Sequence, residues 1–166
     1  MSKLIVDTNV PVVANGRSAS PQASLECVAI CAQKLLDIQR HHILVLDDGW
    51  HILREYIGEL ASSGPGPGDA FLKWILSNQA DPNRCEYTHV TPSVGRLGFE
   101  EFPSASDVAH FHWKDRKFVA VTVAHPEHPP ILNAVDSDWW AYREALARHG
   151  VRVEFLCPDA PFMQGE

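Results

Sequence analysis

The chain has 166 residues, of which 45% are hydrophobic and 21% are charged, and its formal net charge is −7. This length and composition suit one soluble domain spanning 1–166 and exclude wholesale disorder. The negative charge argues against broad, sequence-independent nucleic-acid binding, because affinity for phosphate comes largely from Lys and Arg. It does not argue against a nuclease, because an acidic metal site contributes negative charge that a bound cation reverses.

The first apolar run covers only residues 4–6 before Asp7 interrupts it. Because this run is too short for a signal-peptide core or a bilayer-spanning helix, we expect a cytoplasmic protein with no membrane contact. The four cysteines contain no Cys-x-x-Cys pair, and two of them lie one helical turn apart among apolar residues; they are Cys27, Cys31, Cys85 and Cys157. We expect buried free thiols rather than metal ligands or disulfide partners.

The first half of the chain alternates apolar runs with helical stripes. Residues 3–6 and 43–46 predict buried strands. Ser20 and Pro21 suit the start of a helix that continues at helical spacing to about His41. The next helical stripe is Ile52, Leu53, Tyr56, Ile57 and Leu60. Residues 62–69, in which Gly and Pro alternate, predict a turn or flexible connector before a short helix over 71–75.

The second half continues the alternation after an interruption. Three prolines and two glycines in residues 81–103 predict an irregular insertion at about 79–105, in which a hairpin would fit. Residues 115–124 have strand-like propensity, but the alternation favours a helix there. Residues 131–135 predict a strand, 138–149 a helix and 151–156 the last strand. The pattern predicts an α/β fold, a three-layer α/β/α sandwich with a mainly parallel central sheet.

Four acidic residues stand where predicted strands end or helices run: Asp7, Glu55, Asp115 and Asp136. In parallel sheets, sites form outside the carboxyl ends of the strands, where Asp7 and Asp136 would meet. Carboxylates that converge on one rim suit Mg²⁺ or Mn²⁺, because these ions prefer oxygen ligands and leave positions open for water and phosphate. The sequence therefore predicts an enzyme with a divalent-metal site.

Each acidic residue has an expected role. Asp7 and Asp115 are predicted as direct ligands, and Asp136, Asp138 and Glu55 complete the cluster directly or through metal-bound water. Glu59, one turn after Glu55, could replace it. Asp138 fits metal ligation and helix capping equally. Asn9 fits the orientation of a carboxylate or the attacking water as well as it fits a turn.

These residues resemble the motifs of PIN-domain nucleases. Residues 4–9, Leu-Ile-Val-Asp-Thr-Asn, look like the opening motif, and Glu55, Asp115 and Asp136 follow in the family's order within 3–61 and 107–156. The resemblance implies a PIN-like fold and an Mg²⁺- or Mn²⁺-dependent endoribonuclease that hydrolyses RNA phosphodiester bonds. It also implies the toxin of a toxin–antitoxin pair, with an antitoxin protein as partner, and it leaves a homodimer open.

Two other functions stay open. One is a PIN-like domain that has lost catalysis and serves as a binding or assembly module. Ala134 favours it, because family members often carry Thr or Ser two residues before the last acidic position, and the net charge favours it too. The other is a phosphatase or phosphotransferase with Asp7 as nucleophile, although that chemistry usually needs a second Asp where this chain has Asn9.

Basic and aromatic residues near the acidic positions are candidates for RNA contacts. The basic candidates are Lys114, Arg116, Lys117, Arg17 and Arg54, which fit either phosphate binding or an ordinary solvated surface. The five tryptophans fit stacking on unpaired bases or packing in the core. Dispersed histidines without a His-Glu-x-x-His or Cys-x-x-Cys pattern do not indicate zinc.

Overall fold

The computed structural model describes residues 2–17, 23–94, 98–157 and 163, and its centre is a parallel sheet. The strands are β1 (Ser2–Val6), β2 (His42–Asp47), β3 (Cys85–Thr88), β4 (Ile131–Asn133) and β5 (Val153–Phe155). They lie in the order β3-β2-β1-β4-β5, and every pair is parallel. The strand order reverses at β1, so a crevice is expected between the carboxyl ends of β1 and β4.

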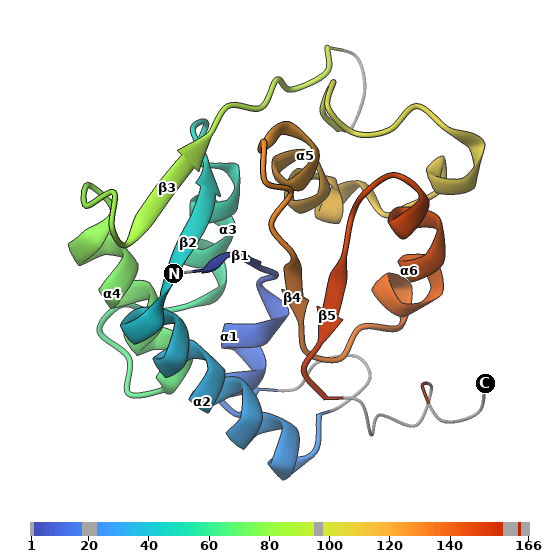
Figure 1. Cartoon of the computed structure of the whole chain (residues 1–166). Helices are drawn as coiled ribbons and strands as arrows, with labels where there is room; N and C mark the ends of the chain where they lie inside the picture. Colours follow the sequence, from blue (N-terminus) through green and yellow to red (C-terminus); the bar gives the residue numbers. More distant parts are fainter. Residues whose placement is uncertain (1, 18–22, 95–97, 158–162, 164–166) are drawn as a thin grey trace.

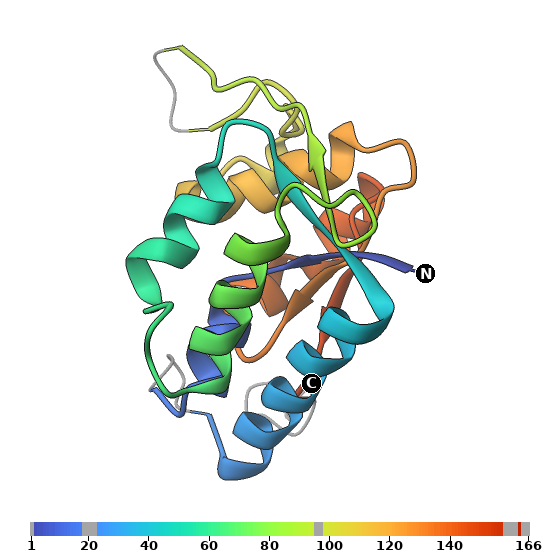
Figure 2. The same cartoon turned by 90° about the vertical axis from the view of Figure 1, so that its left-hand side faces the viewer.

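Helices cover both faces of the sheet. They are α1 (Asn9–Ala14), α2 (Leu25–His41), α3 (His51–Glu59), α4 (Pro67–Asn78), α5 (Arg116–Ala124) and α6 (Ser137–Arg148), with short 3₁₀ turns η1 (Ser106–Val108) and η2 (Trp113–Asp115). One layer contains α1, α2 and α4, which contact one another. The helices α5 and α6 lie across the sheet from α2 (Figures 1 and 2), and α3 is in contact with α5. The predicted three-layer sandwich is confirmed. None of the described helices is both long and apolar enough to cross a membrane.

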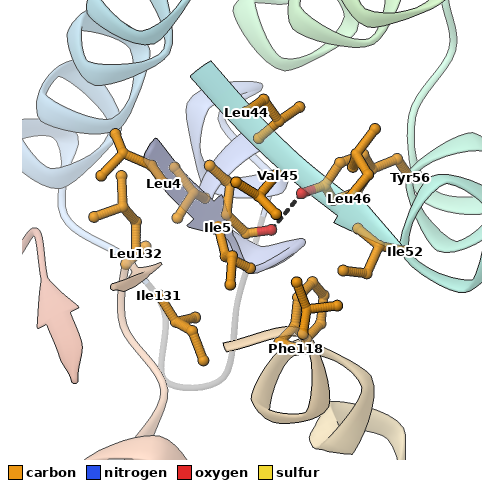
Figure 3. Packing of buried hydrophobic residues seen from close by; sticks show 14 of the residues in the cluster. Leu4, Ile5, Leu44, Val45, Leu46, Ile52, Tyr56, Phe118, Ile131 and Leu132 are labelled. Atoms are coloured by element: carbon orange, nitrogen blue, oxygen red, sulfur yellow. Dashed lines mark hydrogen bonds between the residues drawn. The ribbon is translucent and has the colours of Figure 1, made fainter. Parts of the chain in front are cut away.

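The core surrounds β1 and β2. Ile5, Val6 and Leu44 are completely buried, because helices pack on both faces of these strands, and this explains their uninterrupted apolar sequences. The Tyr56 hydroxyl donates a hydrogen bond to the Val6 carbonyl (Figure 3). Since Tyr56 is on α3 and Val6 ends β1, this bond fixes α3 beside the carboxyl end of the central strand.

The segment predicted as an irregular insertion at about 79–105 contains the edge strand β3, so that part of the prediction is wrong. This strand has only four residues, and its Cys85–Thr88 sequence has no long apolar run. Its pairing with β2 supplies order that the local sequence does not. Beyond β3 the chain crosses towards α6 with one antiparallel bridge between Pro92 and Phe99 (Figure 1).

Three helix starts differ from the expectations. The sequence did not predict α1, because this helix has only six residues and contains a proline. The start of α2 is Leu25, where the Ser24 hydroxyl accepts a hydrogen bond from the Cys27 amide at 3.1 Å, while Ser20 and Pro21 lie outside the described residues. The start of α4 is Pro67, inside the expected connector, because proline suits a first helical turn.

The cysteines fall into two classes. Cys27 and Cys157 form a disulfide, so the expectation of free thiols is wrong for this pair. Their separation of 130 residues left no local signal. Cys31 and Cys85 are buried and free, which confirms the expectation for them. Burial raises the pKa of the Cys31 thiol to about 12 and that of Cys85 to about 11.

The glycine-rich start of α4 supplies a stability prediction. A Cβ at Gly68 would lie 2.0 Å from the Pro11 carbonyl oxygen, a backbone atom that moves only if α1 moves. We expect Gly68→Ala to lower the free energy of unfolding in urea by about 3 kcal/mol. The control is Gly58→Ala on α3, where an added Cβ meets nothing within 4 Å; we expect a gain of about 0.5–1 kcal/mol. Equal stability of the two variants would contradict the close contact between α1 and α4.

Candidate functional site

An acidic cavity of about 450 Å³ opens where β1 and β4 end. Asp7 follows β1 directly, and its amide donates to the Leu132 carbonyl of β4 at 2.9 Å. The parallel register therefore brings Asp7 to the same edge as the loop from β4 to α6. Six acidic residues line the cavity: Asp7, Glu55, Glu59, Asp115, Asp136 and Asp138. Asn9 lines it too, so the structure brings every predicted site residue together.

Asp7 is the most buried of these acids, with 4% of its surface exposed. Its Oδ2 accepts a hydrogen bond from the Asn9 amide at 3.0 Å, whereas Oδ1 is buried and has no hydrogen-bond partner. Burial raises the pKa of Asp7 well above its ordinary value, and repulsion from Asp115 raises it further. A bound cation would satisfy the free oxygen and offset both effects.

Asp115 and Asp136 reach the cavity from two helix starts. Asp115 ends η2, directly before α5, and burial together with repulsion from Asp136 raises its pKa to about 7. Burial also raises the pKa of Asp136. Oδ1 of Asp136 accepts a hydrogen bond from the Asp138 amide at 2.9 Å and caps α6. The capping role that sequence left open for Asp138 is therefore filled by Asp136.

Glu55 is held by two partners. Its Oε1 lies 2.7 Å from the Lys117 ammonium, and its Oε2 accepts a hydrogen bond from the Thr8 hydroxyl. Lys117 is buried and also donates to the Lys114 carbonyl. Its ammonium is therefore not a solvated surface charge, and its acidic partner is Glu55. Sequence reasoning gave Thr8 no role, although the residue stands beside Asp7.

Asn9 joins the two strands at the site. Its Oδ1 accepts a hydrogen bond from the Ala134 amide at 3.0 Å, and its Nδ2 is buried without a partner. Ala134 is fully buried and is not part of the cavity lining, whereas Ser137 is. The cavity therefore has a hydroxyl next to Asp136, although not at the position expected from the family. The adjacency of Ser137 to Asp136 was the sequence signal that could have indicated it.

The remaining basic candidates divide into engaged and exposed groups. Arg116 donates to the Phe111 carbonyl at 3.0 Å and to the Ala109 carbonyl at 2.9 Å. Arg17 donates to the Glu59 carbonyl and lies 3.8 Å from its carboxylate. Lys114 and Arg54 are exposed. These contacts leave few cations at the cavity, so its local potential is negative.

Trp113 is an exposed aromatic residue close to Asp115 in sequence. Trp113 on η2, two residues before Asp115, has 47% of its surface exposed. Its ring stacks on His112 with a centroid separation of 6.1 Å, and the Lys114 ammonium lies 5.7 Å from the centroid of the Trp113 ring. The indole thus has the accessible surface that base stacking needs, and a cation beside it that could contact the RNA backbone.

The donor atoms at the cavity suit a hard divalent cation. The described lining contains carboxylates, hydroxyls and one amide, but no imidazole or thiolate. Within the described residues, however, no three carboxylates have ligand oxygens that all lie within 4.8 Å of one another. The sulfur atoms of Cys27, Cys31 and Cys157 do lie that close together. A cation bound at the cavity would have to draw the carboxylates together against their mutual repulsion.

No protein-family model, curated protein or solved structure matches this chain. The resemblance to PIN-domain nucleases therefore depends on the sequence motifs alone. Because a fold does not imply a function, the functional argument depends on the chemistry of the acidic cavity.

The crowding of the acids gives a pH-dependence prediction for the metal-free protein. The pKa of Asp115 is raised from 3.8 to about 7, so the folded protein keeps a proton that the unfolded chain has already lost. The free energy of unfolding should fall as pH rises from about 4 to 7, by about 1.4 kcal/mol per unit of pKa difference. We expect Asp115→Asn to make this slope shallower in urea titrations with chelator, while the raised pKa values of Asp7 and Asp136 keep part of it. Glu144→Gln, an exposed change on α6, should keep it, and parallel slopes in all three proteins would exclude strong crowding of Asp115.

Proposed function

We propose that this protein is a divalent-metal-dependent endoribonuclease with a PIN-like site, which hydrolyses RNA phosphodiester bonds with Mg²⁺ or Mn²⁺. The observation that carries this proposal is the buried, unpartnered Oδ1 of Asp7 in a cavity lined by six acidic residues. A cavity so negative repels an RNA phosphate unless a cation reverses its potential. A buried carboxylate oxygen without a donor is costly unless a cation or a proton satisfies it.

The proposed roles follow from the contacts of each residue. Asp7, Asp115 and Asp136 would hold the ion, with Asp138 at the exposed side of the cavity. A bound divalent ion would polarise the scissile phosphate and lower the pKa of a water molecule. Asn9 positions Asp7 through its backbone amide, and it positions the loop after β4 through its side-chain oxygen. The pair of Lys117 and Glu55 keeps α3 and α5 at fixed places around these ligands.

The substrate we propose is single-stranded or looped RNA. Trp113 supports this, because an exposed indole can stack on a base that is not paired, whereas the bases of a duplex are covered by their neighbours. Lys114, exposed beside it, can contact the RNA backbone. An overall charge of −7 limits nonspecific affinity, so binding would depend on this local group and on the metal.

The partner we propose is an antitoxin that covers the acidic cavity in a toxin–antitoxin pair in the cytoplasm. Charge complementarity supports it, since basic side chains of a partner could replace the cation at the carboxylates.

A second candidate function is a catalytically inactive binding or assembly module. The ion pair between Glu55 and Lys117 favours it, because it removes one expected carboxylate from metal binding. The Ala134 argument for it is weaker in the structure, since the Ala134 side chain does not reach the cavity and Ser137 does.

Cleavage of a mixed-sequence RNA tests the main proposal. We expect the unaltered protein to cut RNA with Mn²⁺ and not with chelator. Asp7→Asn should lower the rate by at least about 100-fold, because the neutral amide is a poor ligand and cannot balance the ion's charge. Glu144→Gln, prepared in parallel, should retain full activity. Metal-dependent cleavage that is unchanged in Asp7→Asn would show that the cavity is not the active site, and no cleavage by any preparation would favour the binding module.

Base stacking on Trp113 is tested by RNA affinity. We expect Trp113→Ala to weaken binding of a fluorescent single-stranded oligonucleotide about tenfold in anisotropy titrations. Tyr87→Ala on β3, a residue with 37% exposure, is the control and should bind as the unaltered protein does. An unchanged affinity in Trp113→Ala, or equal affinity of the unaltered protein for a blunt duplex, would contradict the proposed substrate.

A further inference from the structure

We propose that the acidic cavity takes one divalent ion rather than two, because the Lys117 ammonium is already the second cation of the site. This inference rests on the proposed metal-dependent function. The resemblance to PIN-domain nucleases does not give the number of ions. Lys117 is assigned a positioning role, in which its ammonium is a permanent counterion of Glu55.

The first argument is that Glu55 has no free oxygen. Its Oε1 lies 2.7 Å from the Lys117 ammonium and its Oε2 accepts from the Thr8 hydroxyl. Asp7 differs, because its Oδ1 is buried without any partner. The two carboxylates face the same cavity, so one of them is available to an ion and the other is already occupied by a cation.

The second argument is that Lys117 is fixed in place. It belongs to the first turn of α5, two residues after Asp115, and it is buried. Its ammonium also donates to the Lys114 carbonyl. An ion that took Glu55 would leave a buried ammonium without the carboxylate that balances its charge, and such a broken ion pair is strongly destabilising. A second ion should therefore bind at least about 100-fold more weakly than the first.

Two of the lining acids already have a cationic partner within the protein. Of the six acids that line the cavity, Glu55 is paired with Lys117, and Glu59 lies 3.8 Å from Arg17. The other four acids are Asp7, Asp115, Asp136 and Asp138, and no described salt bridge to Lys, Arg or His includes them. These four carboxylates are the ones open to an ion, whereas Glu55 and Glu59 already have cationic partners and do not offer a second set of ligands.

Counting bound Mn²⁺ tests the inference without depending on activity. Free Mn²⁺ is followed by electron paramagnetic resonance while the metal-free protein is titrated. We expect one ion per chain for the unaltered protein and two for Lys117→Met, which frees Glu55. Lys114→Met, an exposed change on the same segment, should bind one. The double variant Lys117→Met with Glu55→Gln should also return to one, because the ligand for the second ion is gone.

The outcomes separate the two proposals. No ion bound by the unaltered protein would overturn the proposed metal-dependent function and this inference with it. Two ions of similar affinity in the unaltered protein would overturn the inference alone, and this count needs no variant to fold. One ion in a Lys117→Met protein that keeps its circular dichroism spectrum would also overturn it, since the ammonium would then not be what excludes the second ion.

Discussion

The burial of the Asp7 carboxylate at the end of β1 is the constraint on which the site depends. The central strand places it there, because β1 is paired on both sides and its carboxyl end lies at the point where the strand order reverses. Helices cover both faces, so water has little access to one of its oxygens. The arrangement raises the energy of the metal-free site, and the surrounding core supplies the stability that tolerates it.

The neighbours of Asp7 are held by interactions between different helices and strands of the fold. Tyr56 fastens α3 to β1, Asn9 fastens the start of α1 to the β4 loop, and Lys117 fastens α5 to α3. Each contact joins elements that are distant in sequence. The carboxylates therefore stay near one another because rigid elements carry them, and their mutual repulsion alone would separate them.

The sequence predicted most of this architecture because its signals are local. The apolar runs directly before Asp7 and Asp136 indicate buried parallel strands. The alternation of strand and helix then leaves few possible topologies for the sheet. The strand β3 was missed because its order comes from pairing with β2 rather than from its own residues. The contact of Lys117 with Glu55 was missed for the same reason, since 62 positions separate them and the charge pattern around Asp115 suits a solvated surface equally well.

The disulfide between Cys27 and Cys157 makes a covalent ring of most of the chain. Cytosolic reductants generally keep such bonds open, so the ring is closed only under oxidising conditions. Where it is closed, a protease that cuts one peptide bond between residues 27 and 157 leaves both fragments in one molecule. The cut would then be invisible in the mass of the intact protein, apart from one added water, until the sulfur bond is reduced. If the cut lies before residue 136, the fragment with Asp7 and the fragment with Asp136 would stay joined by the disulfide between Cys27 on α2 and Cys157.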